Sequence, residues 1–346
     1  MAVDLVLLAA PRGFCAGVEM AIKALAWMVR VFEPPVYCYH EIVHNQIVVD
    51  RFRRLGVVFV DDVAAVPPGA PLMLSAHGSA PEVVAAARSN GGVVVDAVCP
   101  LVTKVHHEVK VRAGKGYTVV YVGHAGHDEA VGTMAVAPDS VRLVEKPEDV
   151  GALDIAPDQP VAFLAQTTLS MDEWADVRDA TMERFPEMWM PGRSDLCFAT
   201  TNRQSALRVI AEKADAIVVI GSANSSNTVA LEKVARAQCR GPVYRINSPD
   251  EIPADLHGRV GVTAGASAPE ELVRAVVDRL APTEGVEVVA VTDEDEYFPP
   301  PRELRDLLRA AAAAASGSLL APPARSTLLA DDRALAASDV LDALAR

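Results

Sequence analysis

The sequence predicts an α/β fold with largely parallel sheets. Short apolar runs rich in β-branched residues recur along the chain. Each run ends in a small polar cluster, and a helical pattern of about 10–15 residues follows most clusters. Three cysteines, Cys15, Cys99 and Cys197, occupy similar places in this alternation. Because parallel sheets bind ligands beyond the carboxyl ends of their strands, the polar clusters are also the candidate site residues.

The first half of the chain shows this alternation element by element. The apolar run 3–10 leads through "PRGFCAGV" to a helical pattern at 19–32. The segment "PLMLSAHGSAPE" precedes a predicted helix at 83–90, and "GGVVVDAVCPL" precedes one at 102–114. These strand–helix pairs are typical of βα units.

The second half of the chain continues the pattern. Predicted strands with polar ends lie in "YTVVYVGHAGHDEA" and in "PVAFLAQTTLSMDEWADV". After Cys197 a helical pattern at 203–214 leads to the strand and cluster at 215–227, a helix at 228–238 and a last strand–helix segment at 259–280.

The length of 346 residues allows two or three domains at about 150 residues each. Because a predicted helix follows each of the three cysteines, we expect three similar α/β lobes, each presenting one thiol. The expected lobes are residues 1–97 with Cys15, 98–195 with Cys99, and 196–305 with Cys197 and a closing C-terminal segment. Six alanines at 310–315 and the following Pro/Ser punctuation predict a low-complexity, flexible tail at 306–346.

The composition indicates a globular protein that does not bind nucleic acid. The chain is 51% hydrophobic and 23% charged, and its formal net charge is −14. The absence of a basic block argues against a DNA or RNA partner but leaves room for a small anionic ligand in a local pocket. With no signal-like N-terminus and no apolar run of membrane-spanning length in the sequence, we expect a cytoplasmic protein without a membrane partner.

The five cysteines fall into two groups. Cys15, Cys99 and Cys197 each lie where a helix is expected to begin, and such a position stabilises a thiolate. Cys38 and Cys239 lack that setting and are interpreted as structural. Spacing alone leaves inert burial and a shared metal site both open, because no CxxC pair is present. Three thiolates without an evident fourth ligand would suit an iron–sulfur cluster with one open iron position.

The polar clusters admit two interpretations. Ser and Asn at a helix start are expected simply as N-caps, and a lone His is more often a hydrogen-bonded strand-end residue than a catalyst. However, one such cluster ends almost every predicted strand, and helix N-termini with hydroxyl and amide donors bind phosphate well. The sequence contains no P-loop, GxGxxG or GxSxG motif. The clusters are His40 and His44, His77, His124 with His127 and Glu129, Thr167 and Thr168, Thr200 to Arg203, Ser225 to Asn227, and Ser267.

Ten motifs in order along the chain resemble those of the 4-hydroxy-3-methylbut-2-enyl diphosphate reductases. This family performs the last step of the non-mevalonate isoprenoid pathway. The resemblance runs from about residue 4 to about residue 305, and many independent motifs coincide. The motifs are "PRGFCAGV", "HEIVHN", "SAHG", "CPLVTKVH", "GHAGHDE", "QTTLS", "CFATTNRQ", "NSSNT", "TAGAS" and "FPPPREL".

The resemblance implies a trefoil of three α/β lobes around a central [4Fe–4S] cluster. It implies reductive removal of the substrate hydroxyl, giving isopentenyl and dimethylallyl diphosphate, at a cluster with one iron open. It also implies an electron donor such as ferredoxin, or flavodoxin with its reductase. Two alternatives remain beside the reductase: a non-catalytic iron–sulfur sensor or regulator on the same fold, and a metal-free nucleotide-binding protein.

The same resemblance assigns roles to individual residues. Cys15, Cys99 and Cys197 correspond to the cluster ligands. His127, Glu129 and Thr167 correspond to positions around the substrate hydroxyl, with Glu129 as the proton source. We therefore expect the pKa of Glu129 to be raised by burial near the diphosphate charge. The positions that correspond to diphosphate binding are His44, His77, Ser225, Ser226, Asn227 and Ser267.

Overall fold

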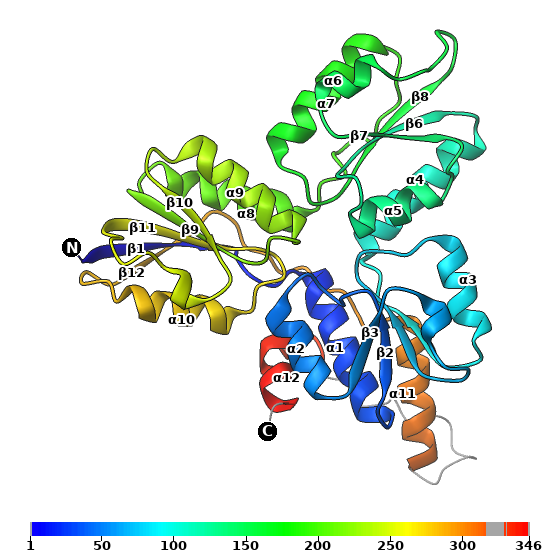
Figure 1. The fold of residues 1–346 in the computed structure, drawn as a ribbon, viewed down its shortest axis with the longest axis horizontal. Coiled ribbons are helices and arrows are strands. Elements are labelled where there is room, and N and C mark those ends of the chain that lie inside the picture. Colours follow the sequence, from blue (N-terminus) through cyan, green and yellow to red (C-terminus); the bar gives the residue numbers. More distant parts are fainter. Residues whose placement is uncertain (1, 316–328, 330, 345–346) are drawn as a thin grey trace. The chain divides into compact units, whose positions relative to one another are not determined.

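The computed structural model describes residues 2–315, 329 and 331–344, which form two compact units (Figure 1). Unit 1 consists of Met1–Cys15, Ser79–Pro81 and Pro100–Asp295. Unit 2 consists of Ala16–Gly78, Glu82–Cys99 and Glu296–Arg346.

A five-stranded parallel sheet forms one part of unit 1. Its central strands are mostly apolar, apart from Asp4, Arg259 and Thr263, and most of their residues are buried, as expected of a parallel sheet covered by helices. Leu7 of the N-terminal strand lies opposite Gly261 on one side and Glu287 on the other. In sheet order the strands are β10 (Val243–Ile246), β9 (Ala216–Ile220), β11 (Gly258–Ala264), β1 (Val3–Ala10) and β12 (Val286–Ala290).

The helices of this sheet bury its apolar side chains. Leu207 and Ile210 of one helix and Leu231 of the next form a core with Leu7 and Ile217 of the strands. These two helices, α8 and α9, lie side by side in Figure 1. The helices are α8 (Phe198–Ala211), α9 (Ser226–Gln238), α10 (Glu270–Leu280) and the 3₁₀ turn η2 (Pro249–Glu251).

A three-stranded parallel sheet forms the rest of unit 1. Its strand order is β7 (Val141–Val144), β6 (Thr118–Val122), β8 (Val161–Ala165). Alternate residues of β6 point to two separate cores, so that Val120 and Tyr121 are both fully buried on opposite faces. The helices are α4 (Pro100–Gly114), α5 (Asp128–Ala135), α6 (Pro147–Gly151) and α7 (Met171–Arg184).

Unit 2 contains a four-stranded parallel sheet with the order β3 (Val57–Val60), β2 (Val36–Tyr39), β4 (Leu72–Leu74), β5 (Val94–Asp96). Asn45 caps α2 by accepting hydrogen bonds from the backbone N–H groups of Ile47 and Val48. The helical segments are α1 (Ala16–Val31), α2 (Gln46–Arg54), η1 (Val63–Ala65), α3 (Pro81–Ser89), α11 (Arg302–Ala315) and α12 (Ala337–Leu344).

The C-terminal segment of unit 2 is anchored on α1 by a buried cation. Lys23 is 4% exposed, and its Nζ donates to the carbonyl oxygens of Asp332 (2.7 Å) and Leu335 (3.2 Å). Nζ also lies 3.5 Å from the Asp332 carboxylate, which accepts a hydrogen bond from the hydroxyl of Tyr297. Glu19 accepts from the Ala337 N–H at the start of α12, which lies beside α1 in Figure 1.

The predicted fold class is confirmed, since every pairing among the described strands is parallel. The structure differs from the expected organisation in two places. The strand β1 lies in the sheet of β9 to β12, whereas the predicted first lobe, 1–97, included it. Within the predicted flexible tail, α11 and α12 are helical, and residues 316–328, 330, 345 and 346 lie outside the described residues. The lobe boundaries at 97 and 195 stay a prediction.

None of the helices in the described part of the chain combines the length and the apolar character needed to cross a membrane.

Candidate functional site

Cys15 lies in a turn that is held against the end of β11. The Cys15 N–H donates to the Ala266 carbonyl (3.2 Å), and the Gly13 N–H donates to that of Ala264 (3.2 Å). Gly13 has a φ of +65°, a conformation that favours glycine, and a Cβ there would lie 3.1 Å from the Ala268 oxygen. The glycine of "PRGFC" therefore allows the turn to approach the loop that follows β11.

Cys197 is the N-cap residue of α8. Its Sγ accepts the backbone N–H of Thr200 (3.3 Å) and lies 3.1 Å from the Thr200 hydroxyl. The same hydroxyl accepts a hydrogen bond from Asn227 Nδ2 (3.3 Å), and Asn227 Oδ1 accepts the Ala266 N–H (2.8 Å). The peptide units on either side of Ala266 thus connect Asn227 and Cys15, while Thr200 connects Asn227 to Cys197.

The two cysteine thiols of unit 1 have the chemistry of metal ligands. Burial, together with the negative charge of a Cys15 thiolate, raises the pKa of Cys197 to about 12. The two sulfur atoms are therefore close enough to interact electrostatically. A cation that displaces both protons would relieve this repulsion, as in thiolate metal sites. The thiols of Cys15 and Cys197 consequently fit an iron–sulfur group.

Four buried donors surround the N-terminus of α9. Ser225 is the N-cap residue, and its Oγ accepts the Thr228 N–H (3.4 Å). The Ser267 hydroxyl lies 3.5 Å from that of Ser225, so the two clusters predicted from sequence meet. N-capping accounts for Ser225 alone. The hydroxyl of Ser267 and the side chains of Ser226 and Asn227 add uncharged donors at a helix N-terminus, where an anion is stabilised.

Glu129 is buried in the first turn of α5, with 3% of its surface exposed. Its Oε1 accepts the backbone N–H of Thr167 (2.7 Å), and its Oε2 accepts the Thr167 hydroxyl (3.0 Å). Burial, with a smaller contribution from the charge of Asp195, raises the pKa of Glu129 to about 7 against the two hydrogen bonds from Thr167. The carboxyl group can therefore hold a proton near neutral pH.

His127 precedes Glu129 as the N-cap residue of α5. Its Nδ1 accepts the Glu129 N–H (3.2 Å), so in the neutral ring the proton is on Nε2. Cys197 is also connected to this group, because its N–H donates to the Thr167 carbonyl (3.0 Å).

Gln166 is a residue of this site that the sequence analysis did not single out. It is fully buried, and its Nε2 donates to the hydroxyls of Thr168 (3.0 Å) and Ser226 (3.0 Å). Its Oε1 accepts the His124 N–H (2.9 Å). Gln166 therefore connects the loops after β6 and β8 with the start of α9. The available signal was its place in "QTTLS", directly after an apolar run.

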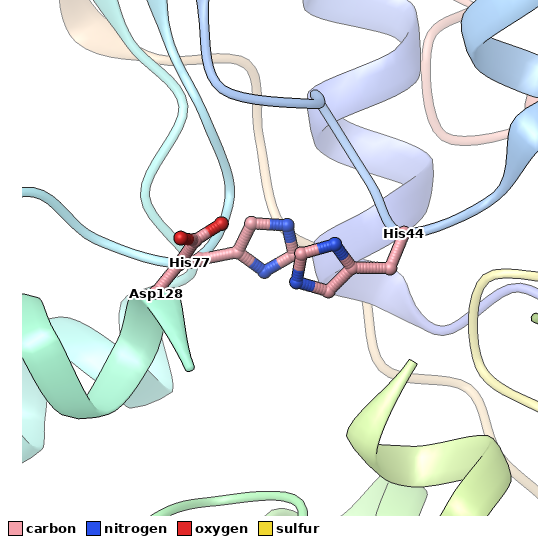
Figure 2. Close-up of side chains that lie close together, drawn as sticks. All are labelled: His44, His77 and Asp128. Carbon is pink, nitrogen blue, oxygen red and sulfur yellow. The ribbon is translucent and has the colours of Figure 1, made fainter. Parts of the chain in front are cut away.

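Unit 2 carries His44, His77 and Cys99. The imidazoles of His44 and His77 are stacked, with ring centroids 3.9 Å apart and an interplanar angle of 10° (Figure 2). His44 Nδ1 lies 3.4 Å from Glu41 Oε2. Asp128, also drawn in Figure 2, belongs to unit 1, where it is the first residue of α5.

Cys99 follows the loop after β5, and its N–H donates to the Ala76 carbonyl (3.0 Å), next to His77. It directly precedes Pro100, the first residue of α4. The two other cysteines have different settings: Cys38 is fully buried in β2, where burial raises its thiol pKa, and Cys239 ends α9.

The predicted site residues are thus divided between the two units. Unit 1 brings together its two cysteines, the carboxyl group of Glu129 and the donors around α9, through hydrogen bonds that also involve Thr200, Gln166 and Ala266. Unit 2 brings together the two histidines and places Cys99 beside their loop.

Fold and site define an α/β protein with half-buried thiols, a carboxyl group able to carry a proton, and uncharged donors for an anion. The family described as LytB protein matches residues 6–281. The chain therefore belongs to the LytB protein family, and it is an oxidoreductase.

Several relatives of this chain are named as diphosphate reductases. A 4-hydroxy-3-methylbut-2-enyl diphosphate reductase of Rhodopirellula baltica is 47% identical over 305 residues, which is 87% of this chain and 95% of the relative. A reductase of the same name, numbered 1, from Mycobacterium tuberculosis is 47% identical over 309 residues, covering 87% and 94%. The structure of the E-1-hydroxy-2-methyl-but-2-enyl-4-diphosphate reductase from Plasmodium falciparum superposes with a TM-score of 0.86 at 31% identity, covering 89% of this chain and 99% of that one. The resemblance stated from the motifs is confirmed.

Proposed function

We propose that the chain converts 4-hydroxy-3-methylbut-2-enyl diphosphate into isopentenyl and dimethylallyl diphosphate. The reaction takes up two electrons and two protons, breaks the allylic C–O bond and releases water. The choice of substrate is supported by the relatives in this family that are named 4-hydroxy-3-methylbut-2-enyl diphosphate reductase. The observation that carries the chemistry is Glu129, a buried carboxyl group with a pKa of about 7 that is held by Thr167.

A [4Fe–4S] cluster, held by Cys15, Cys99 and Cys197 with one iron not ligated by protein, is the proposed cofactor. When bound, it would supply the electrons and a position for the hydroxyl oxygen. The hydrogen bonds that join Cys15 to Cys197 through Ala266, Asn227 and Thr200 support this assignment, because they hold the two thiols in one site. Ferredoxin, or flavodoxin with its reductase, is the proposed electron donor, and the cytoplasm the proposed location.

The chain's own residues bind and protonate the substrate. Glu129 holds the proton that leaves with the hydroxyl oxygen as water, and the Thr167 hydroxyl and N–H keep its carboxyl group oriented. His127 is proposed to donate from Nε2 toward the same oxygen. The protonated acid is needed at neutral pH because it must give up a proton during the reaction.

The diphosphate is proposed to bind to uncharged donors. In unit 1 these are Ser225, Ser226, Asn227 and Ser267 at the N-terminus of α9, where the helix dipole favours an anion. The same role is assigned to His44 and His77 of unit 2, whose rings gain positive charge on protonation. This donor set suits a chain with a net charge of −14, because no surface basic patch is required.

Conversion of the authentic substrate by anaerobically reconstituted protein tests the proposal. With a strong chemical reductant, both isopentenyl and dimethylallyl diphosphate should form, and Ser226→Ala should raise KM because it removes one anion donor. Iron-loaded protein that leaves the substrate unchanged would contradict the proposed function. A non-catalytic sensor, which is not favoured by the reductase names of the relatives, would give that negative result.

A further inference from the structure

Arg203 is the largest fully buried side chain of the protein's described part, with 1% of it exposed. It lies in α8, the helix that Cys197 caps. It ends the polar cluster Thr200 to Arg203 of "CFATTNRQ", and the proposed reaction does not use it. A buried guanidinium requires a reason, because Arg stays charged and its five N–H donors must all find acceptors.

The backbone oxygens that accept hydrogen bonds from Arg203 lie within two residues of Cys15 or Cys197, the two cysteines of unit 1. Nη2 donates to the carbonyls of Gly13 (2.8 Å) and Phe14 (3.2 Å), and Nε donates to Gly13 (3.1 Å). Nη1 donates to the Ala199 carbonyl (3.0 Å) in the first turn of α8. Gly13 and Phe14 directly precede Cys15, so one side chain joins the turn of Cys15 to the helix of Cys197.

The charge of Arg203 is offset by one carboxylate. Nη1 lies 3.0 Å from both oxygens of Glu294, which also accepts a hydrogen bond from Asn202 (3.1 Å). The guanidinium therefore contacts the segments of both cysteines through carbonyl oxygens and shares Nη1 between Ala199 and Glu294. A positive charge close to half-buried thiolates stabilises added negative charge, and a cluster gains negative charge when it is reduced.

We propose that Arg203 is a positioning residue that fixes Cys15 relative to Cys197 and makes the reduction potential of the group they hold less negative. Glu294 limits the second effect. The inference rests on the proposed function, because it takes these cysteines as ligands of an iron–sulfur cluster. Hydrogen bonds around a cluster and nearby charges are established determinants of its potential.

The test compares Arg203→Met, Arg203→Lys and Glu294→Gln with the wild type. Arg208→Met is the matched control, since Arg208 lies in the same helix but pairs with the exposed Asp172. Bound iron per chain and the reduction potential, followed by electron paramagnetic resonance, are measured after anaerobic reconstitution. Alkylation of Cys15 in the cluster-free proteins is followed by mass spectrometry, with circular dichroism as the check of folding.

We expect Arg203→Met to retain iron about 10- to 100-fold less well, as for other residues that orient ligands, and to shift the potential to more negative values. Arg203→Lys keeps the positive charge but lacks the planar guanidinium group with its several donors. Its reduction potential should therefore be closer to the wild-type value than its iron content is. Glu294→Gln should shift the potential in the opposite direction, to less negative values. A merely structural role would not produce shifts of opposite sign.

In the cluster-free proteins, Cys15 should be alkylated faster in Arg203→Met than in the wild type or in Arg208→Met. Wild-type iron content, potential and alkylation rate in a folded Arg203→Met protein would overturn the inference. If the wild type itself binds no iron, the proposed function fails. The alkylation rates then decide the positioning role alone: a faster rate supports it and an unchanged rate overturns it.

Discussion

Glu129 and Thr167 form a closed pair in which one carboxyl group accepts both the backbone N–H and the hydroxyl of the same residue, at 2.7 and 3.0 Å. Glu129 lies in α5, whereas Thr167 lies in the loop that follows β8. The loop after the strand therefore orients both oxygens of the Glu129 carboxyl group. Burial raises the pKa of this oriented carboxyl group to about 7, so the pair can store a proton where the substrate hydroxyl is proposed to bind.

Glu129→Gln should lower kcat by about 100-fold or more, because the amide preserves the shape but cannot supply the proton. Thr167→Val should have a smaller effect and should raise the pKa seen in the pH–rate profile, since the hydroxyl hydrogen bond lowers the pKa of Glu129. Steady-state kinetics across pH measure both. Glu183→Gln, an exposed change on α7, is the control, and an unchanged turnover in Glu129→Gln would remove the proposed role.

The stability of the cluster-free protein should fall as pH rises from about 4 to about 7. Burial raises the pKa of Glu129 and of Asp195 to about 7 in the folded state, above their ordinary values of 4.5 and 3.8. The folded state then binds more protons than the unfolded state in this window, and each group contributes a slope of up to about 1.4 kcal/mol per pH unit.

Urea unfolding at a series of pH values measures this dependence. Asp195→Asn should flatten it, because the amide does not titrate, whereas Glu183→Gln should leave it unchanged. A wild-type stability that stays flat or rises between pH 4 and 7, with the same profile in Asp195→Asn, would show that these two groups are not held in their protonated form.

Gly265→Ala should destabilise the protein by about 1–3 kcal/mol. A Cβ at this position would lie 2.0 Å from the Thr228 hydroxyl, because α9 packs closely against the loop after β11. Thr228→Ala removes the clashing atom, so the double variant should recover most of the loss. Thermal unfolding measures the four combinations. Gly114→Ala, where a Cβ meets no atom within 4 Å, is the control, and additivity of the two changes would contradict the packing argument.

Lys23→Met should cost about 3–5 kcal/mol in the full chain, because it leaves the Asp332 carboxylate and two carbonyls without their buried cation. In a chain that ends at Ala315 those partners are gone and Lys23 reaches solvent, so the same substitution should cost little. Unfolding experiments on the four proteins measure this coupling. Arg54→Met, an exposed change on α2 of the same unit, should be neutral in both backgrounds, and an equal cost of Lys23→Met in both would exclude the anchor.

Serine substitutions should separate the five cysteines into two groups. Changing Cys15, Cys99 or Cys197 should remove most of the bound iron, because each is a proposed ligand. Changing Cys38 or Cys239 should retain it, since one is buried in β2 and the other ends α9. Iron quantification after anaerobic reconstitution measures this, and loss of iron in only one or two of the three ligand variants would contradict a shared site.

The strand–helix alternation and the polar strand ends were predictable because both depend on local patterns. Buried runs such as Ala216–Ile220 read as strands, and the Ser225 cap was visible in "NSSN". The place of β1 in the sheet was not predictable, since β1 and β11 are both mostly apolar and their pairing depends on contacts between residues about 250 positions apart in sequence.

Within the site, the sequence indicated the residues proposed to contact a ligand. It indicated less well the residues that hold these side chains in place. Glu129 and Asn227 lie in recognisable clusters. Arg203 also lies in such a cluster, but its contacts and those of Gln166 are hydrogen bonds to distant segments, Gly13 and Ser226 among them. No local pattern reports such a contact. The docking of α12 was equally hidden, because it depends on Lys23 becoming buried more than 300 residues away in sequence.

The proposed function requires that the chain binds a cluster with one iron that contacts the substrate. Mössbauer spectroscopy of ⁵⁷Fe-reconstituted protein, before and after addition of 4-hydroxy-3-methylbut-2-enyl diphosphate, measures this contact. We expect the signal of a single iron site to change while the signals of the other irons persist. A spectrum in which no iron site responds, or a protein that binds no iron, would contradict it.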